Sequence, residues 1–158
     1  MMSRPFMRCD RSPAAAVQPP ARRTAITRAL VLLLGPSVLH ARPVADADAA
    51  RWAAAAAAMR SLAESWGDQS YGAVLVRDGR IIGHGPSRVV KNRDPDAHAE
   101  REALRDARER WGPQAVRGAV LYSTARPCAA CETAAAAAGV ARMVFGDSLQ
   151  DGGVPGQR

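Results

Sequence analysis

The chain has 158 residues, enough for one domain with a modest hydrophobic core. Hydrophobic residues make up 47% and charged residues 23% of the sequence, as in a soluble globular protein, and aromatic residues make up only 4%. The formal net charge of +7 comes mainly from residues 1–47, whereas the 15 basic and 13 acidic residues of 48–158 nearly cancel. This balance argues against a function dominated by contacts to nucleic-acid phosphates.

Residues 1–47 have the layout of an export signal. A basic segment containing Arg22-Arg23 precedes a short apolar run at 29–34, which is too short to span a bilayer. Ala45-Asp46-Ala47 offers a cleavage site between small residues, and the paired arginines are typical of twin-arginine signals. We therefore predict a periplasmic or secreted protein without a stable membrane anchor. A cytoplasmic protein with a misassigned start codon, or with a disordered extension, is the alternative.

The rest of the chain alternates helical and strand patterns. In chain order we expect a helix at 48–66, strands at 71–76 and 80–83, a helix at 96–111, a strand at 119–123, a helix at 128–138 and a strand at 142–145. This order predicts an α/β sheet whose first two strands are antiparallel and whose later strands are joined by helical crossovers. We assign 48–146 to one domain and 147–158 to a flexible C-terminal tail.

Two short motifs carry the candidate chemistry. His98 and Glu100 lie at the start of one predicted helix, and Cys128 and Cys131 lie at the start of the next. Cysteines at i and i+3 share a helix face, and a helix N-terminus favours the thiolate form that zinc requires. One imidazole and two thiolates leave one tetrahedral position for water, as in catalytic zinc sites. The sequence therefore predicts His98, Cys128 and Cys131 as zinc ligands and Glu100 as the carboxylate that moves protons.

Other interpretations of these residues are weaker. An isolated Cys-x-x-Cys also occurs in thioredoxin-like redox proteins, but there it follows the first buried strand, whereas Cys128 follows the third. Glu100 by itself would be an ordinary surface carboxylate in the first turn of a helix. The coincidence of a histidine, a glutamate and two cysteines at two helix starts favours the zinc centre.

The segment from Asp94 to Glu100 (Asp-Pro-Asp-Ala-His-Ala-Glu) resembles the D-P-T-A-H-A-E motif of the cytidine-deaminase-like nucleoside and nucleobase deaminases. Residues 121–131, with 139–140 and 144–146, resemble the second half of the same domain, so the resemblance covers about residues 50–146. It implies a three-layer α-β-α fold with a mixed central sheet and helices on both faces. It also implies a Zn²⁺ cofactor and a homodimer.

The same resemblance indicates Tyr71, Ser87 and Ala99 as candidate substrate contacts. The Tyr71-Gly72-Ala73-Val74 strand is more similar to that of guanine and general nucleoside deaminases than to that of tRNA adenosine deaminases; a core position is the alternative for Tyr71. Family members usually carry an asparagine where this chain has Ser87, and Asn92 is out of register. A hydroxyl does not reproduce the paired donor and acceptor of an amide, so the family's substrate preference does not carry over.

We therefore expect a zinc-dependent hydrolase that deaminates a guanine-, cytosine- or adenosine-type base or nucleoside and releases ammonia. Deamination of the tRNA wobble adenosine is the first alternative, and the near-neutral 48–158 segment and the export signal argue against it. A catalytically silent, zinc-stabilised binding module is the second alternative. Ser87 and the short segment after the fourth strand favour that reading.

Overall fold

The computed structural model describes residues 46–157, so positions 1–45 of the predicted export signal lie outside the described residues. The helices are α1 (Asp46–Ser65), α2 (Val89–Asn92), α3 (Ala99–Trp111) and α4 (Ala129–Ala138), with a 3₁₀ turn at Pro113–Val116. The strands are β1 (Gly72–Arg77), β2 (Arg80–Pro86), β3 (Val120–Ser123), β4 (Arg142–Phe145) and β5 (Gln150–Gly153). Within this described part, no helix is both long and apolar enough to cross a membrane.

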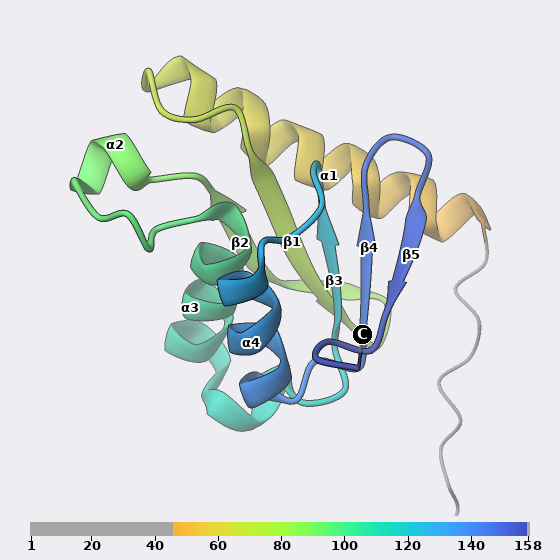
Figure 1. Cartoon of the computed structure of the whole chain (residues 1–158). Coiled ribbons are helices and arrows are strands. Elements are labelled where there is room, and N and C mark those ends of the chain that lie inside the picture. The colour runs from red at the N-terminus through yellow and green to blue at the C-terminus, as the bar shows by residue number, and fades with distance from the viewer. Residues whose placement is uncertain (1–45, 158) are drawn as a thin grey trace, which may run out of the picture. The chain divides into compact units, whose positions relative to one another are not determined.

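The five strands form one mixed sheet in the order β2-β1-β3-β4-β5. β1 pairs antiparallel with β2 and β3, β3 and β4 run parallel, and β5 returns antiparallel to β4. Figure 1 shows α1 on one face of the sheet and α3 and α4 on the other. The three-layer α-β-α fold with a mixed sheet, expected from the sequence, is therefore confirmed.

The central strands β1 and β3 are buried on both faces, and their successive residues point to opposite layers. Val74, Val76 and Tyr122 pack with Trp52 of α1. The alternate positions, including Ala73, Leu75 and Leu121, belong to the core that the sheet shares with alanines of α3 and α4. The small alanine side chains let the helices lie close to the strands, which explains how a chain with few aromatic residues closes its core.

The edge strand β2 touches α3 through glycine. A side chain at Gly85 would overlap the carbonyl oxygen of Ala99, and one at Gly83 would overlap that of Ala103. Glycine is needed here because the helix backbone lies directly on the strand. This contact holds the first turn of α3, which follows His98, against the sheet.

The segment after β4 differs from its predicted flexible state. Residues Gln150–Gly153 form β5 and pair with β4, although glycine and aspartate have low strand propensity. Arg142 of β4 donates two hydrogen bonds to Asp151, from Nε at 2.8 Å and from the second guanidinium nitrogen, and the amide of Gly153 donates to the same carboxylate at 2.9 Å. Cross-strand pairing with Arg142 therefore orders a segment whose local composition indicates disorder.

We expect Asp151→Asn to lower the free energy of unfolding by at most about 1 kcal/mol near neutral pH, because both partners are half exposed to solvent. The hydrogen bonds from Arg142 lower the pKa of Asp151 from 3.8 to about 2. A carboxyl group whose pKa is lower in the folded than in the unfolded protein stabilises the fold at pH values above its unfolded-state pKa. The difference in unfolding free energy between variant and wild type should therefore be full above pH 3.8 and disappear as the pH falls towards 2. Thermal unfolding at neutral and acidic pH measures it, with the exposed Asp147→Asn as control. A pH-independent difference would contradict the ion-pair explanation.

Candidate metal centre and active site

Two helix starts bring the candidate ligands together. His98 is the N-cap of α3 and Cys128 the N-cap of α4, both with extended backbone, and neither side chain caps its own helix. The sequence analysis predicted both residues inside the first turn, whereas in the structure each lies one residue before its helix begins. Because these side chains make no hydrogen bond to their own helices, they can approach each other between the starts of α3 and α4. Cys131, from the first turn of α4, lies beside them.

The distances between the candidate ligand atoms fit zinc. His98 Nδ1 lies 3.6 Å from Cys128 Sγ and 3.5 Å from Cys131 Sγ, and the three residues offer ligand atoms within 4.8 Å of one another. Zinc–sulfur bonds of about 2.3 Å and zinc–nitrogen bonds of about 2.0–2.1 Å at tetrahedral angles place sulfur and nitrogen about 3.6 Å apart. The spacing and the chemistry of the donors both fit a zinc ion with one position left for a fourth ligand.

Glu100 lies beside this group. Its carboxylate is buried, with 7% of the residue exposed, and Cys131 Sγ lies 3.4 Å from its Oε2. Burial raises the pKa of Glu100 above its ordinary value, against the opposing effects of hydrogen bonds and the nearby His98. A buried carboxyl group with a raised pKa takes up and releases protons nearer to neutral pH than an exposed one.

Burial also raises the pKa of the Cys131 thiol, and the negative charge of Glu100 adds to this effect. At Cys131 the preference for the thiolate that we expected from the N-terminus of α4 is therefore opposed by burial and by Glu100 when no metal is bound. A bound cation reverses the balance because metal ligands bind as thiolates and release their protons on binding.

The three candidate substrate contacts have different surroundings. Tyr71 is 48% exposed just before β1, so the core position considered as its alternative does not apply. Ser87 is fully buried and its hydroxyl donates to Asp68 Oδ1 at 2.9 Å, whereas Asn92 is exposed. Ala99 is buried in the core shared by the sheet and α3. Of the three side chains, that of Tyr71 is the most accessible.

Backbone hydrogen bonds join the segments at this end of the sheet. The amide of Ser87 donates to Tyr71, and the amide of Thr124 donates to the carbonyl of Gly72. Thr124 Oγ1 in turn accepts the Gly72 amide at 3.1 Å. The loop that leads into Cys128 is therefore attached to Gly72 at the start of β1, and the end of β2 is attached to the neighbouring Tyr71.

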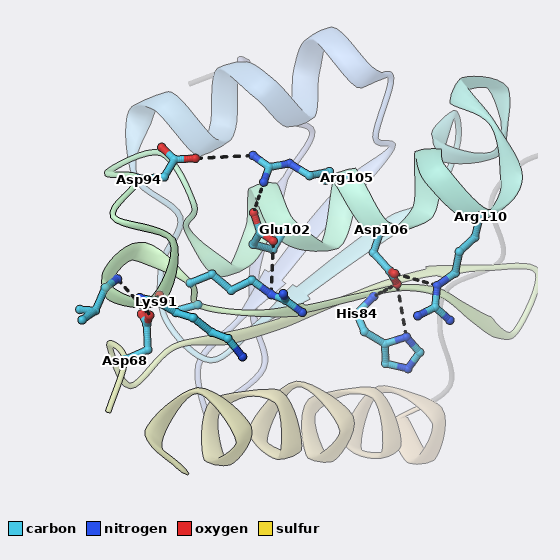
Figure 2. Close-up of polar contacts among 11 residues, drawn as sticks. Asp68, His84, Lys91, Asp94, Glu102, Arg105, Asp106 and Arg110 are labelled. Carbon is cyan, nitrogen blue, oxygen red and sulfur yellow. Dashed lines mark hydrogen bonds and ion pairs between the residues drawn. The ribbon is translucent and has the colours of Figure 1, made fainter. Parts of the chain in front are cut away.

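A charged network links α3 to the loop after β2 (Figure 2). Glu102 pairs with Arg105 at 2.8 Å and with Arg88 at 3.5 Å, and Arg105 reaches Asp94 at 3.8 Å. Two surface hollows lie along this helix, and neither is lined by His98, Cys128 or Cys131. The network joins the loop after β2 to α3 rather than forming part of the metal centre.

Asp68 is a residue that sequence reasoning missed. It follows the end of α1 and accepts hydrogen bonds from the loop after β2. Although burial by itself raises its pKa, hydrogen bonds from Lys91, Gln69, Ser87 and Val90 hold the pKa of Asp68 below its ordinary value. Near Asp68 in the sequence we see only an acidic residue that follows Gly67 at the end of a predicted helix. Such a pattern does not predict hydrogen bonds to residues some twenty positions further along the chain.

A three-layer α-β-α domain with a His-Cys-Cys group and a buried glutamate is the arrangement of a zinc-dependent deaminase domain. Residues 46–147 match the family described as the cytidine and deoxycytidylate deaminase zinc-binding region, and the chain belongs to this family. The expected zinc cofactor is the one that this family binds.

Relatives within the family differ in substrate. The chain is 40% identical over 82 residues to a tRNA-specific adenosine deaminase of Agrobacterium fabrum, covering 52% of this chain and 54% of that protein. It is 41% identical over 61 residues to a guanine deaminase of Bacillus subtilis, covering 39% of each. A solved structure from a study of tRNA:A34 deaminases matches with a TM-score of 0.58 and 34% identity, covering 60% of this chain and 73% of that one. The chain thus spans about half the length, or less, of these two curated relatives.

Proposed function

We propose that the protein is a zinc-dependent hydrolase that deaminates a nucleobase or nucleoside. His98, Cys128 and Cys131 hold the zinc ion, and Glu100 is the catalytic acid and base. The observation that carries this proposal is the buried Glu100 carboxylate directly beside the three ligand residues. Hydrolysis at a zinc centre needs a group that moves protons, and this site has such a group beside the ligand residues.

The reaction consumes one water and exchanges the exocyclic amine of the ring for an oxygen, with ammonia as the second product. Zinc bound at this position supplies Lewis-acid activation of water. Glu100 accepts one proton from the attacking water at its carboxylate oxygen and passes it to the ring nitrogen. It then takes the second proton from the hydroxyl group added to the ring carbon and delivers it to the amine, so that the carbon–nitrogen bond breaks, a carbonyl forms and ammonia leaves. Burial supports both directions of transfer because it brings the proton affinity of the carboxylate closer to that of its partners.

The charge distribution favours a small substrate over tRNA. Three arginines of α3 are paired with carboxylates of the same chain: Arg101 with Asp96 at 2.9 Å, Arg105 with Glu102 at 2.8 Å and Arg110 with Asp106 at 2.7 Å. Paired arginines do not supply the unbalanced positive surface that phosphate binding needs. The similarity to tRNA-specific adenosine deaminases nevertheless makes tRNA the second candidate substrate.

A substrate panel tests the proposal. Zinc-loaded protein is incubated with guanine, cytosine, adenosine and a tRNA anticodon stem-loop, with ammonia release and inosine formation as readouts. We expect ammonia from at least one free base or nucleoside and no inosine in the stem-loop. Inosine in the stem-loop, without ammonia release from any free base or nucleoside, would establish tRNA as the substrate. Zinc binding without turnover of any of the four would favour a silent binding module.

Two further expectations extend this proposal. Export to the periplasm or medium rests on residues 1–47 and stays a prediction, for which the location of the full-length product in fractionated cells is the test. Homodimerisation rests on the family resemblance and also stays a prediction.

A further inference from the structure

Asp68 connects the end of α1 with the loop after β2. Its Oδ2 accepts the amides of Val90 and Lys91 at 2.9 and 2.8 Å, and its Oδ1 accepts the hydroxyl of Ser87 at 2.9 Å and the amide of Gln69 at 2.7 Å. Figure 2 shows Asp68 facing the Lys91 segment. Four donors on one carboxylate, three of them from another part of the chain, fix the position of the short α2 helix.

The neighbouring Trp66 strengthens this attachment. The ammonium group of Lys91 lies 3.4 Å from the centre of the Trp66 ring, and the guanidinium of Arg88 lies 5.2 Å from it. Both distances are in the range of cation–π contacts. The Asp68 amide itself donates to the carbonyl of Ala63 in the last turn of α1, so the backbone that carries the carboxylate is attached to the helix.

The anchored loop continues to His98 through backbone hydrogen bonds. Arg88, next to Ser87, donates its amide to the carbonyl of Ala97 at 3.0 Å, and Ala97 is the residue before His98. The amide of Ala97 donates to Asp94 at 3.1 Å. A shift of the loop near Ser87 would therefore also move the backbone of Ala97, the residue before His98.

The opposite side of the loop is held by α3. Glu102, whose side chain is 8% exposed, pairs with Arg88 at one end of the loop, and Arg105 reaches Asp94 at the other. The segment from Ser87 to Ala97 is thus attached on one side to α3 and on the other to Asp68. Removal of Asp68 leaves the ion pairs to α3, the Trp66 contacts and the Ser87–Tyr71 backbone hydrogen bond in place, but takes away three hydrogen bonds to the segment.

We propose that Asp68 is a positioning residue for the metal centre, which fixes the Ser87–Ala97 segment and through it the imidazole of His98. This inference rests on the proposed role of His98 as a zinc ligand. It also assigns Ser87 to the anchor: its hydroxyl is donated to Asp68 and does not replace the asparagine amide of related deaminases as a substrate contact. Groups that hydrogen-bond directly to a metal ligand typically change metal affinity by about 10–100-fold when removed, and Asp68, which acts on His98 only through the loop backbone, should fall at the lower end of that range or below it.

The test uses the full chain and the variants Asp68→Ala, Asp68→Asn and Ser87→Ala. Hydrogen exchange in the metal-free protein reports on the segment, and competition with a chromogenic chelator gives the dissociation constant for zinc. We expect Asp68→Ala to speed exchange about tenfold at Val90 and Lys91, with smaller increases at Arg88 and Ala97. Zinc binding should weaken by a few-fold to about tenfold. Asp68→Asn keeps one acceptor oxygen and should fall between wild type and Asp68→Ala, and Ser87→Ala removes one of the four donors and should have the smallest effect.

Glu64→Ala is the matched control, because Glu64 is an exposed carboxylate near the end of α1 that bonds to Ser70 and not to the loop. The proposal is overturned if Asp68→Ala loosens only Val90 and Lys91 while Arg88, Ala97 and zinc affinity match the control. If Asp68→Ala does not fold, Asp68→Asn is judged by the same criteria. A wild-type protein that binds no zinc would refute the proposed function, and the exchange pattern at Arg88 and Ala97 would still decide the role of Asp68.

Discussion

Replacement of Glu100 by glutamine is expected to reduce turnover by about 10²–10⁴-fold, the range that a positioned proton-transfer group contributes. Glutamine keeps the size and hydrogen-bonding capacity of the buried side chain but cannot accept and return a proton. Zinc content should stay at the wild-type level because Glu100 is not among the three grouped ligand residues. Steady-state ammonia release on the best substrate of the panel, together with metal analysis, measures both quantities.

The matched control is Glu109→Gln, an exposed carboxylate on the same helix. It should leave turnover and zinc content unchanged. A Glu100→Gln enzyme within about threefold of wild-type activity would remove Glu100 from the mechanism, since even the weakest such catalysis contributes more. Loss of zinc in that variant would instead assign Glu100 to the architecture of the centre.

Substitution of Cys128 by serine is expected to weaken zinc binding by more than about 100-fold, because loss of a ligand exceeds the effect of losing an outer partner. Turnover should be lost with the metal. Cys128 is exposed whereas Cys131 is buried, so a change at Cys128 removes a sulfur with little disturbance of the core. Zinc titration by chelator competition and activity at fixed zinc concentration provide the measurement.

Metal removal adds a stability readout to the same comparison. A chelator should lower the unfolding free energy of the wild-type protein by about 3 kcal/mol when zinc had been present at about 100 times its dissociation constant. The Cys128→Ser variant should not respond to the chelator, and Cys9→Ser, whose cysteine lies outside the predicted domain, should behave as wild type. Full zinc binding by Cys128→Ser would contradict the ligand assignment.

Sequence patterns predicted most of the fold. The hydrophobic run before Asp78-Gly79 and the apolar segment ending at Ser123 became β1 and β3, and the alanine-rich stretches became α1 and α4. These elements are predictable because burial on both sheet faces requires continuous apolar runs, and helix ends require glycine or capping geometry nearby. The strand at Gln150–Gly153 was not predictable, because its pairing depends on Arg142, a residue on another strand.

The grouping of His98 and Glu100 with Cys128 and Cys131 was predicted from residue type and spacing alone, and the structure brings these four side chains together. Few combinations of these side chains at two helix starts serve any purpose other than a metal centre with a proton carrier. The tertiary structure decided the surroundings of that centre. Ser87 is directed into a buried hydrogen bond with Asp68, and Tyr71 stays exposed. Such contacts join residues far apart in the chain, and they depend on how helices and loops pack around the sheet, which local patterns do not encode.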